Sequence, residues 1–238
     1  MPNLLKRGFR GLEAIARRYG YRVSWTPPAV LKSGRELSFD FEFAVAHLML
    51  SRPEVFFVQI GANDGISNDP LHEFITRFRW EGVLIEPLPD AFRLLQQTYA
   101  GHPQLHLINA AVAEHDGMQK FYTIDADEST FGKAHQFSSF NREALLGQTD
   151  WVPDVAQRIV ETEVPCLSFD SLVRAVGDRS VDILLIDAEG YDLAILRMID
   201  FARMRPSIIC YEHVQMTKSE RDEAAALLIR NEYRVSAD

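Results

Sequence analysis

The sequence predicts an α/β domain with a mostly parallel central sheet flanked by helices, preceded by an N-terminal helical extension. Short apolar runs rich in β-branched and aromatic residues alternate with stretches of helical periodicity, which is typical of a parallel sheet buried on both faces. The chain has 238 residues, and 47% of them are hydrophobic. This is enough for one sizeable core. We therefore predict an extension over residues 1–52 and one domain over residues 53–238.

The extension is expected to contain two helices. Residues 1–20 predict an amphipathic helix whose basic residues lie outside its apolar stripe. A pair of prolines, Pro27 and Pro28, ends this part, and a second helix is expected from about Phe39 to Leu50. Three roles stay open for the first helix. It could pack on the domain or on a second subunit of a homo-oligomer, dock peripherally on an anionic membrane surface, or contact the acceptor.

The domain then alternates strands with helices, as parallel strands joined by right-handed crossovers would require. The predicted strands are residues 55–60, 82–87, 105–112, 120–124, 181–187, 207–213 and 232–236. The predicted helices are 71–78, 91–100 with Asp90 as its N-cap and Gly101 at its end, one after Ser168 or Asp170, 191–200 and 219–230.

Residues 125–160 interrupt this alternation because they are polar and less periodic. We interpret them as an insertion that lies over the carboxyl edge of the sheet and covers an acceptor. A solvated helix with ordinary polar residues is the alternative. The candidates for contact with a polyhydroxylated acceptor are Ser138, Ser139, Asn141, Arg142 and Trp151.

Composition excludes several functional classes. The formal net charge is -9, which disfavours non-specific binding to nucleic acid. No apolar run approaches the roughly 20 residues that span a bilayer, and the N-terminus is too charged for a secretory signal. The two cysteines, Cys166 and Cys210, lie in strand-like runs and are expected to be buried and unpaired. We therefore expect a cytoplasmic protein.

Ligand-binding residues are expected at the carboxyl ends of the strands, where open α/β sheets bind their ligands. The loop Gly-Ala-Asn-Asp-Gly at 61–65 follows the first strand, and its glycines allow backbone to approach a ligand closely. Glu86 follows the second strand, where a carboxylate can accept hydrogen bonds from ribose hydroxyls. The loop lacks the GxGxxG spacing because residue 63 is Asn, and no P-loop is present. These features favour an adenosine-bearing ligand other than NAD or ATP.

More acidic groups follow the later strands. Asp187 and Glu189 follow the strand 181–187, and Glu212 and His213 end the strand 207–213. Each has an ordinary structural alternative, such as an N-cap or a buried polar residue, but several at one edge indicate a site. The three carboxylates are hard oxygen ligands suited to Mg²⁺, although a metal is not favoured.

The ordered series VQIGANDGISNDP, GVLIEPLPDAF, INAAVAEHDG, VPCLSFDSL, VDILLIDAEGYDLAIL and IICYEH resembles the FkbM family of S-adenosylmethionine-dependent methyltransferases. The resemblance covers residues 54–236. It implies a Rossmann-like class I methyltransferase fold and O-methylation of a sugar, glycan or other small-molecule hydroxyl. It also implies that Gly61, Ala62 and Asn63 form the turn under the methionine part of the cofactor, with Asp64 at the same edge and Glu86 holding the ribose.

The resemblance assigns the remaining cofactor contacts to the later strands. Asn109 and Ala111 would lie beside the adenine, and Asp187 and Glu189 would face the sulfonium and the acceptor. Gln59 departs from the pattern, since an acidic residue is more usual before IGAN and would contact the cofactor amine. The fold usually ends in an antiparallel hairpin, whereas here only two residues follow EYRVS.

Methyl transfer from a sulfonium is an in-line displacement in which the protein aligns the acceptor and removes its proton. His213 is the first candidate for this base because imidazole titrates near neutral pH, and Asp187 or Glu189 is the second. Two alternatives stay open. One is a non-catalytic cofactor-binding module of the same fold, and the other is an enzyme that uses a nucleotide sugar or NAD.

Overall fold

A computed structural model of the chain describes residues 41–52, 54–125, 137–147 and 152–235, without the side chains of residues 42 and 43. The predicted amphipathic helix at 1–20 and Trp151 lie outside these residues. The helix expected from about Phe39 to Leu50 is confirmed as α3, Phe41–Ser51. Among the described residues, no helix is both long and apolar enough to cross a bilayer.

The predicted alternation of strands and helices is confirmed through most of the domain. The strands are β1 Phe56–Ile60, β2 Glu81–Ile85, β3 Leu105–Ile108, β4 Ala111–Ala113, β5 Gly117–Ile124, β6 Ser138–Ser139, β7 Ile159–Ser168, β8 Ile183–Ile186 and β9 Ile208–Tyr211. The helices are α4 His72–Phe78, α5 Pro89–Thr98, α7 Arg142–Leu146, α8 Val155–Arg158, α9 Phe169–Val176, α10 Asp192–Met198 and α11 Lys218–Arg230.

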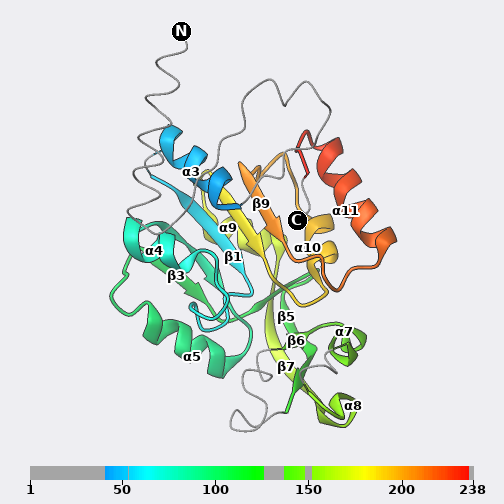
Figure 1. Cartoon of the computed structure of the whole chain (residues 1–238). Helices are drawn as coiled ribbons and strands as arrows, with labels where there is room; N and C mark the ends of the chain where they lie inside the picture. The colour runs from blue at the N-terminus through cyan, green and yellow to red at the C-terminus, as the bar shows by residue number, and fades with distance from the viewer. Residues whose placement is uncertain (1–40, 53, 126–136, 148–151, 236–238) are drawn as a thin grey trace. The chain divides into compact units, whose positions relative to one another are not determined.

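The main sheet is parallel and has the strand order β3-β2-β1-β8-β9 (Figure 1). The chain runs outward from β1 to β2 and β3, and then resumes on the other side of β1 with β8 and β9. The order of the strands therefore reverses between β1 and β8. Loops leaving these two strands diverge at their carboxyl ends, and a ligand site is expected in the opening between them. This is the Rossmann-like architecture that the sequence predicts.

Alternate side chains of the sheet pack on two different helical layers. Val58 of β1 and Leu184 of β8 are fully buried in one cluster with residues of α9, α10 and α11. On the opposite face, Phe57 contacts Trp80, and Trp80 stacks on Phe74 of α4. Both faces are thus covered, which explains why the strands are continuous apolar runs in the sequence.

A second sheet was not predicted. It has the order β4-β7-β5-β6, in which β5 pairs antiparallel with β7 and with β6. The single strand predicted at 105–112 is wrong, because the chain leaves the main sheet after β3 and enters the second sheet as β4. Asn109 lies at this change of direction and donates to the carbonyls of Glu86 and Pro87. Figure 1 shows β5, β6 and β7 grouped with α7 and α8.

Three predicted boundaries are also corrected. Residues 232–235 form no strand, since the Tyr233 hydroxyl donates to the Pro206 carbonyl at 2.7 Å and its ring contacts Phe201. Asp90 is not the N-cap of α5, because the helix begins at Pro89, two residues before the predicted start, and Leu88 is the N-cap. Proline is well suited to a first helical position. The helix ends at Thr98, before Gly101.

Candidate functional site

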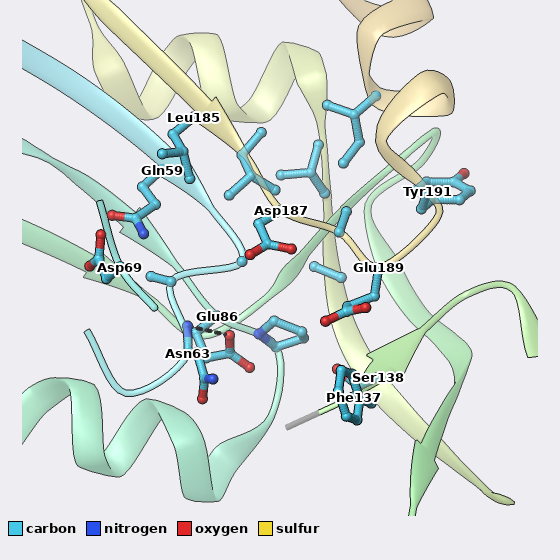
Figure 2. A pocket seen from close by; sticks show the side chains of 18 of the residues that line it. Gln59, Asn63, Asp69, Glu86, Phe137, Ser138, Leu185, Asp187, Glu189 and Tyr191 are labelled. Atoms are coloured by element: carbon cyan, nitrogen blue, oxygen red, sulfur yellow. Dashed lines mark hydrogen bonds between the residues drawn. The ribbon is translucent and has the colours of Figure 1, made fainter. Parts of the chain in front are cut away.

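A cavity of about 510 Å³ opens at the carboxyl ends of β1, β2 and β8, where the strand order reverses. Seven of the residues predicted for the cofactor or for catalysis line it, namely Gly61, Ala62, Asn63, Glu86, Ala111, Asp187 and Glu189. Figure 2 labels the side chains of four of them, Asn63, Glu86, Asp187 and Glu189, together with those of Gln59, Asp69 and Tyr191, which were not predicted as site residues. Asp64, Asn109 and His213 are not among the lining residues.

Gly61 joins the ends of the three central strands. Its N–H donates to the Ile85 carbonyl of β2 at 2.9 Å, and its φ of 83° is a conformation that favours glycine. A Cβ at this position would lie 1.8 Å from the Asp187 carbonyl oxygen, which is far inside van der Waals contact. The position therefore excludes every residue with a side chain, and the backbones after β1 and β8 lie against each other.

Glu86 is nearly buried and holds the turn after β1. One carboxylate oxygen accepts from the Asn63 N–H at 2.8 Å and the other from the Leu88 N–H at 2.9 Å. Burial raises the pKa of Glu86 to about 7, and the two backbone donors act in the opposite direction. Each oxygen keeps a lone pair, so the carboxylate can accept two further hydrogen bonds from hydroxyl groups in the cavity.

Two predicted site residues have structural contacts instead. Asp64 accepts from the N–H groups of Ile66 and Ser67 at 2.9 and 2.7 Å, which closes the turn after the glycine loop. Asn109 holds the backbone after β2, as described above. Both residues shape the cavity wall without lining it.

Carboxyl groups gather at the end of β8 and form an acidic cluster of Asp187, Glu189 and Glu212. Carboxylate oxygens of the three residues lie within 4.8 Å of one another, a spacing that one cation could bridge. Burial and the neighbouring Asp187 and Glu212 raise the pKa of Glu189 to about 8. The pKa of Glu212 is raised to about 7, again chiefly by burial. Glu189 lines the cavity and also accepts from the Gln215 amide.

His213 follows the acidic cluster but does not line the cavity. Its Nδ1 is buried and has no hydrogen-bond partner among the described residues. Its carbonyl accepts from the Met216 N–H at 3.1 Å in the turn before α11. The sequence placed His213 at the correct edge of the sheet, while the direction of its side chain depends on this turn.

The described part of the insertion forms one side of the cavity. Phe137, Ser138 and Phe140 line it, and the Phe140 ring contacts Tyr191 with centroids 4.8 Å apart. The other polar candidates have local roles, since the Ser139 hydroxyl and the Asn141 side chain accept backbone N–H groups at the start of α7. Arg142 is the exposed first residue of that helix.

Gly190 lies where the insertion meets the loop after β8. Its φ is 89°, and a Cβ there would lie 2.9 Å from both the Ala144 Cβ of α7 and the Gln215 Oε1. The contact brings α7 against the loop that carries Glu189.

The sequence profile of the methyltransferase FkbM domain matches residues 59–235, which includes every element that lines the cavity. The chain belongs to the FkbM methyltransferase family. It is accordingly a methyltransferase, and the resemblance inferred from its motifs is confirmed. No curated protein and no solved structure matches the chain.

Sequence reasoning found the strand-end residues of this FkbM methyltransferase but missed Asp69 and the aromatic residues of the insertion. Asp69 lies inside the motif VQIGANDGISNDP, but neither a motif rule nor the resemblance gave it a role. A weaker signal was present, because an Asp before Pro70 and the helix α4 is typical of a turn that fixes a carboxylate. Phe140 and Tyr191 belong to segments that are far apart in the sequence, so only the fold brings them together.

Proposed function

We propose that this FkbM methyltransferase transfers the methyl group of S-adenosylmethionine to a hydroxyl of a sugar, glycan or other small-molecule acceptor. One observation carries the proposal. Four carboxyl groups line the cavity, those of Asp69, Glu86, Asp187 and Glu189, and no described lining residue is basic. A sulfonium ligand with an ammonium group is complementary to such a site, whereas the phosphates of NAD or a nucleotide sugar would be repelled.

The residues around the cavity fit the parts of this cofactor. The turn at Gly61, Ala62 and Asn63 brings backbone to the cavity surface, where it can contact the methionine moiety. Glu86 has free lone pairs for the ribose hydroxyls, and Ala111 offers a small apolar surface to the adenine. When bound, the cofactor supplies an activated methyl group, so the protein has to bind, align and deprotonate the acceptor.

Glu189 is the base that we propose for the acceptor hydroxyl. It lines the cavity, and Figure 2 shows its carboxyl pointing into the cavity above Phe137 and Ser138 of the insertion. Its pKa of about 8 lies near neutral pH, where a general base is most effective. His213 is the alternative base from the sequence, and its position outside the cavity lining makes it second to Glu189.

Calorimetry and a methyl-transfer assay together test the proposal. We expect S-adenosylmethionine and S-adenosylhomocysteine to bind, and NAD and a uridine-diphosphate sugar not to bind at the same concentrations. Incubation with methyl-labelled cofactor and a panel of hydroxylated sugars should give a labelled ether. The variant Glu86→Gln should weaken cofactor binding, while Asp90→Asn, which changes a highly exposed carboxylate on α5, should not.

Each failure has a different meaning. Tight binding of NAD in preference to S-adenosylmethionine would overturn the assignment of the cofactor. Cofactor binding without methyl transfer to any hydroxylated acceptor would favour a non-catalytic binding module of the same fold. Methyl transfer to a nitrogen or carbon atom would keep the cofactor and reject the hydroxyl acceptor.

A further inference from the structure

We infer that Asp69, together with Gln59, binds the primary ammonium group of the ligand's amino-acid moiety. The inference rests on the proposed function and adds to it a subsite with a defined chemistry. Gln59 and Asp69 both line the cavity, and Figure 2 shows them at one side of it, apart from Glu189 and the insertion residues. The proposed subsite thus lies at the end of the cavity away from the acceptor.

Gln59 is a polar residue in a strand that is otherwise apolar. It is only 2% exposed, and its neighbours in register are Leu84 of β2 and Leu185 of β8. Its Oε1 atom is buried and has no partner among the described residues. A buried acceptor without a donor is unfavourable, so a residue of this kind in a strand core indicates a partner that comes from outside the protein. The cavity is the side from which that donor can approach.

Asp69 has a carboxyl group with one oxygen in use and one unpaired. Its Oδ1 accepts from the Leu71 N–H at 2.7 Å, which fixes the side chain at the start of α4. Its Oδ2 is buried and has no partner among the described residues. Burial raises the pKa of Asp69, and the Leu71 N–H, the neighbouring Gln59 amide and His72 act in the opposite direction. A bound cation would favour the ionised carboxylate further.

The two unpaired oxygens suit an ammonium group better than they suit a hydroxyl or an amide. An ammonium has three donors and a positive charge, so it can pair with the Asp69 carboxylate and the Gln59 carbonyl oxygen at once. Two of the other lining carboxyls are less suited. Both oxygens of Glu86 already accept backbone N–H groups, and Glu189 accepts from Gln215.

This subsite also accounts for the departure at position 59. The resemblance to the family led us to expect an acidic residue there for the cofactor amine, and the chain has an amide instead. Asp69 supplies a carboxylate beside that amide from the next segment of the chain. The negative charge is thus present but comes from the loop before α4, and the amide contributes a neutral acceptor.

A pair of ligands that differ only in the amine tests the inference. S-adenosylhomocysteine carries the amine, and 5′-deoxy-5′-(3-carboxypropylthio)adenosine lacks it. Calorimetry should show that Asp69→Asn weakens binding of the first compound at least tenfold and of the second less than threefold. The substitution keeps the acceptor for the Leu71 N–H, so the fold should be retained. The double variant Gln59→Glu, Asp69→Asn should recover most of the lost affinity, because the carboxylate returns at position 59.

Glu189→Gln is the matched control, since it removes a lining carboxylate at the other end of the cavity. It should leave the ratio of the two affinities within threefold of the wild-type ratio. Equal weakening of both compounds in Asp69→Asn would show a structural role for Asp69 and overturn the inference while leaving the cofactor assignment intact. A wild-type protein that binds neither compound would overturn the proposed function and the subsite with it.

Discussion

Binding of S-adenosylmethionine should release protons from the protein at neutral pH, and Glu189 should be the main source. Its pKa is raised to about 8 by burial and by the nearby carboxyls of Asp187 and Glu212. At pH 7 a group with this pKa is about 90% protonated. Before the cofactor binds, Glu189 is therefore mostly a neutral carboxylic acid, whereas the proposed mechanism needs a carboxylate.

The size of the effect follows from the charge of the ligand. An opposite charge within about 4–6 Å lowers a carboxyl pKa by about 1–3 units, which would bring Glu189 to between about 5 and about 7. The protonated fraction at pH 7 then falls to between roughly 50% and roughly 1%, so Glu189 releases about 0.4 to 0.9 proton per bound ligand. Affinity should consequently increase as the pH rises from 6 to 8, because the ionised site binds the cation.

Titration calorimetry in two buffers of different ionisation enthalpy measures the number of released protons. Glu86 and Glu212 also have raised pKa values and contribute to the total, so the informative quantity is the difference between wild type and Glu189→Gln. We expect the variant to release about 0.4 to 0.9 proton fewer. The uncharged ligand 5′-methylthioadenosine should release few protons from either protein. Equal release by wild type and variant would refute the pKa of Glu189 or its place beside the ligand.

Three further predictions concern the backbone, the base and a metal. Gly61→Ala should lower the free energy of unfolding by about 3 kcal/mol, because an alanine there has a positive φ and overlaps the Asp187 carbonyl. Chemical denaturation measures this loss. Gly101→Ala is the control and should change the free energy of unfolding little, because no atom lies near the new Cβ. Glu189→Gln should reduce turnover at least tenfold, and His213→Ala should reduce it less than threefold. If His213→Ala has the larger effect, His213 is the base instead of Glu189. Exhaustive chelation should leave methyl transfer unchanged, and recovery of a lost activity by Mg²⁺ would place a cation in the acidic cluster.

The main sheet was predictable because its strands are short apolar runs and four of the five, β1, β2, β8 and β9, are followed by a helix. The second sheet was not, since β4 has three residues, β6 has two, and β5 pairs with β7 across more than thirty intervening residues. The run at 105–112 is apolar apart from His106 and Asn109, so hydrophobicity alone does not reveal that Asn109 turns the chain between two sheets.

The candidate site was predictable to the extent that it depends on strand ends. Glu86 and Asp187 follow parallel strands directly, and topology alone brings them to one edge. Side chains further along the loops depend on local backbone conformation, which the sequence pattern does not specify. Glu189 has a φ of 49°, an uncommon value for a residue with a side chain, and it lines the cavity. His213 does not line the cavity, and Asp69 reaches it from a turn to which the sequence assigned no role.

The contact at Gly190 has a consequence for how such an enzyme can change its acceptor. Most of the cofactor contacts that we propose come from β1, from the loops after β1 and β2, and from Ala111 of β4, whereas α7 meets the loop after β8 at a position with no room for a side chain. Sequence changes in the insertion alter the acceptor wall without altering the residues that would hold the cofactor. Substrate choice and cofactor binding can therefore diverge separately in evolution, while Gly190 is kept because α7 packs against it.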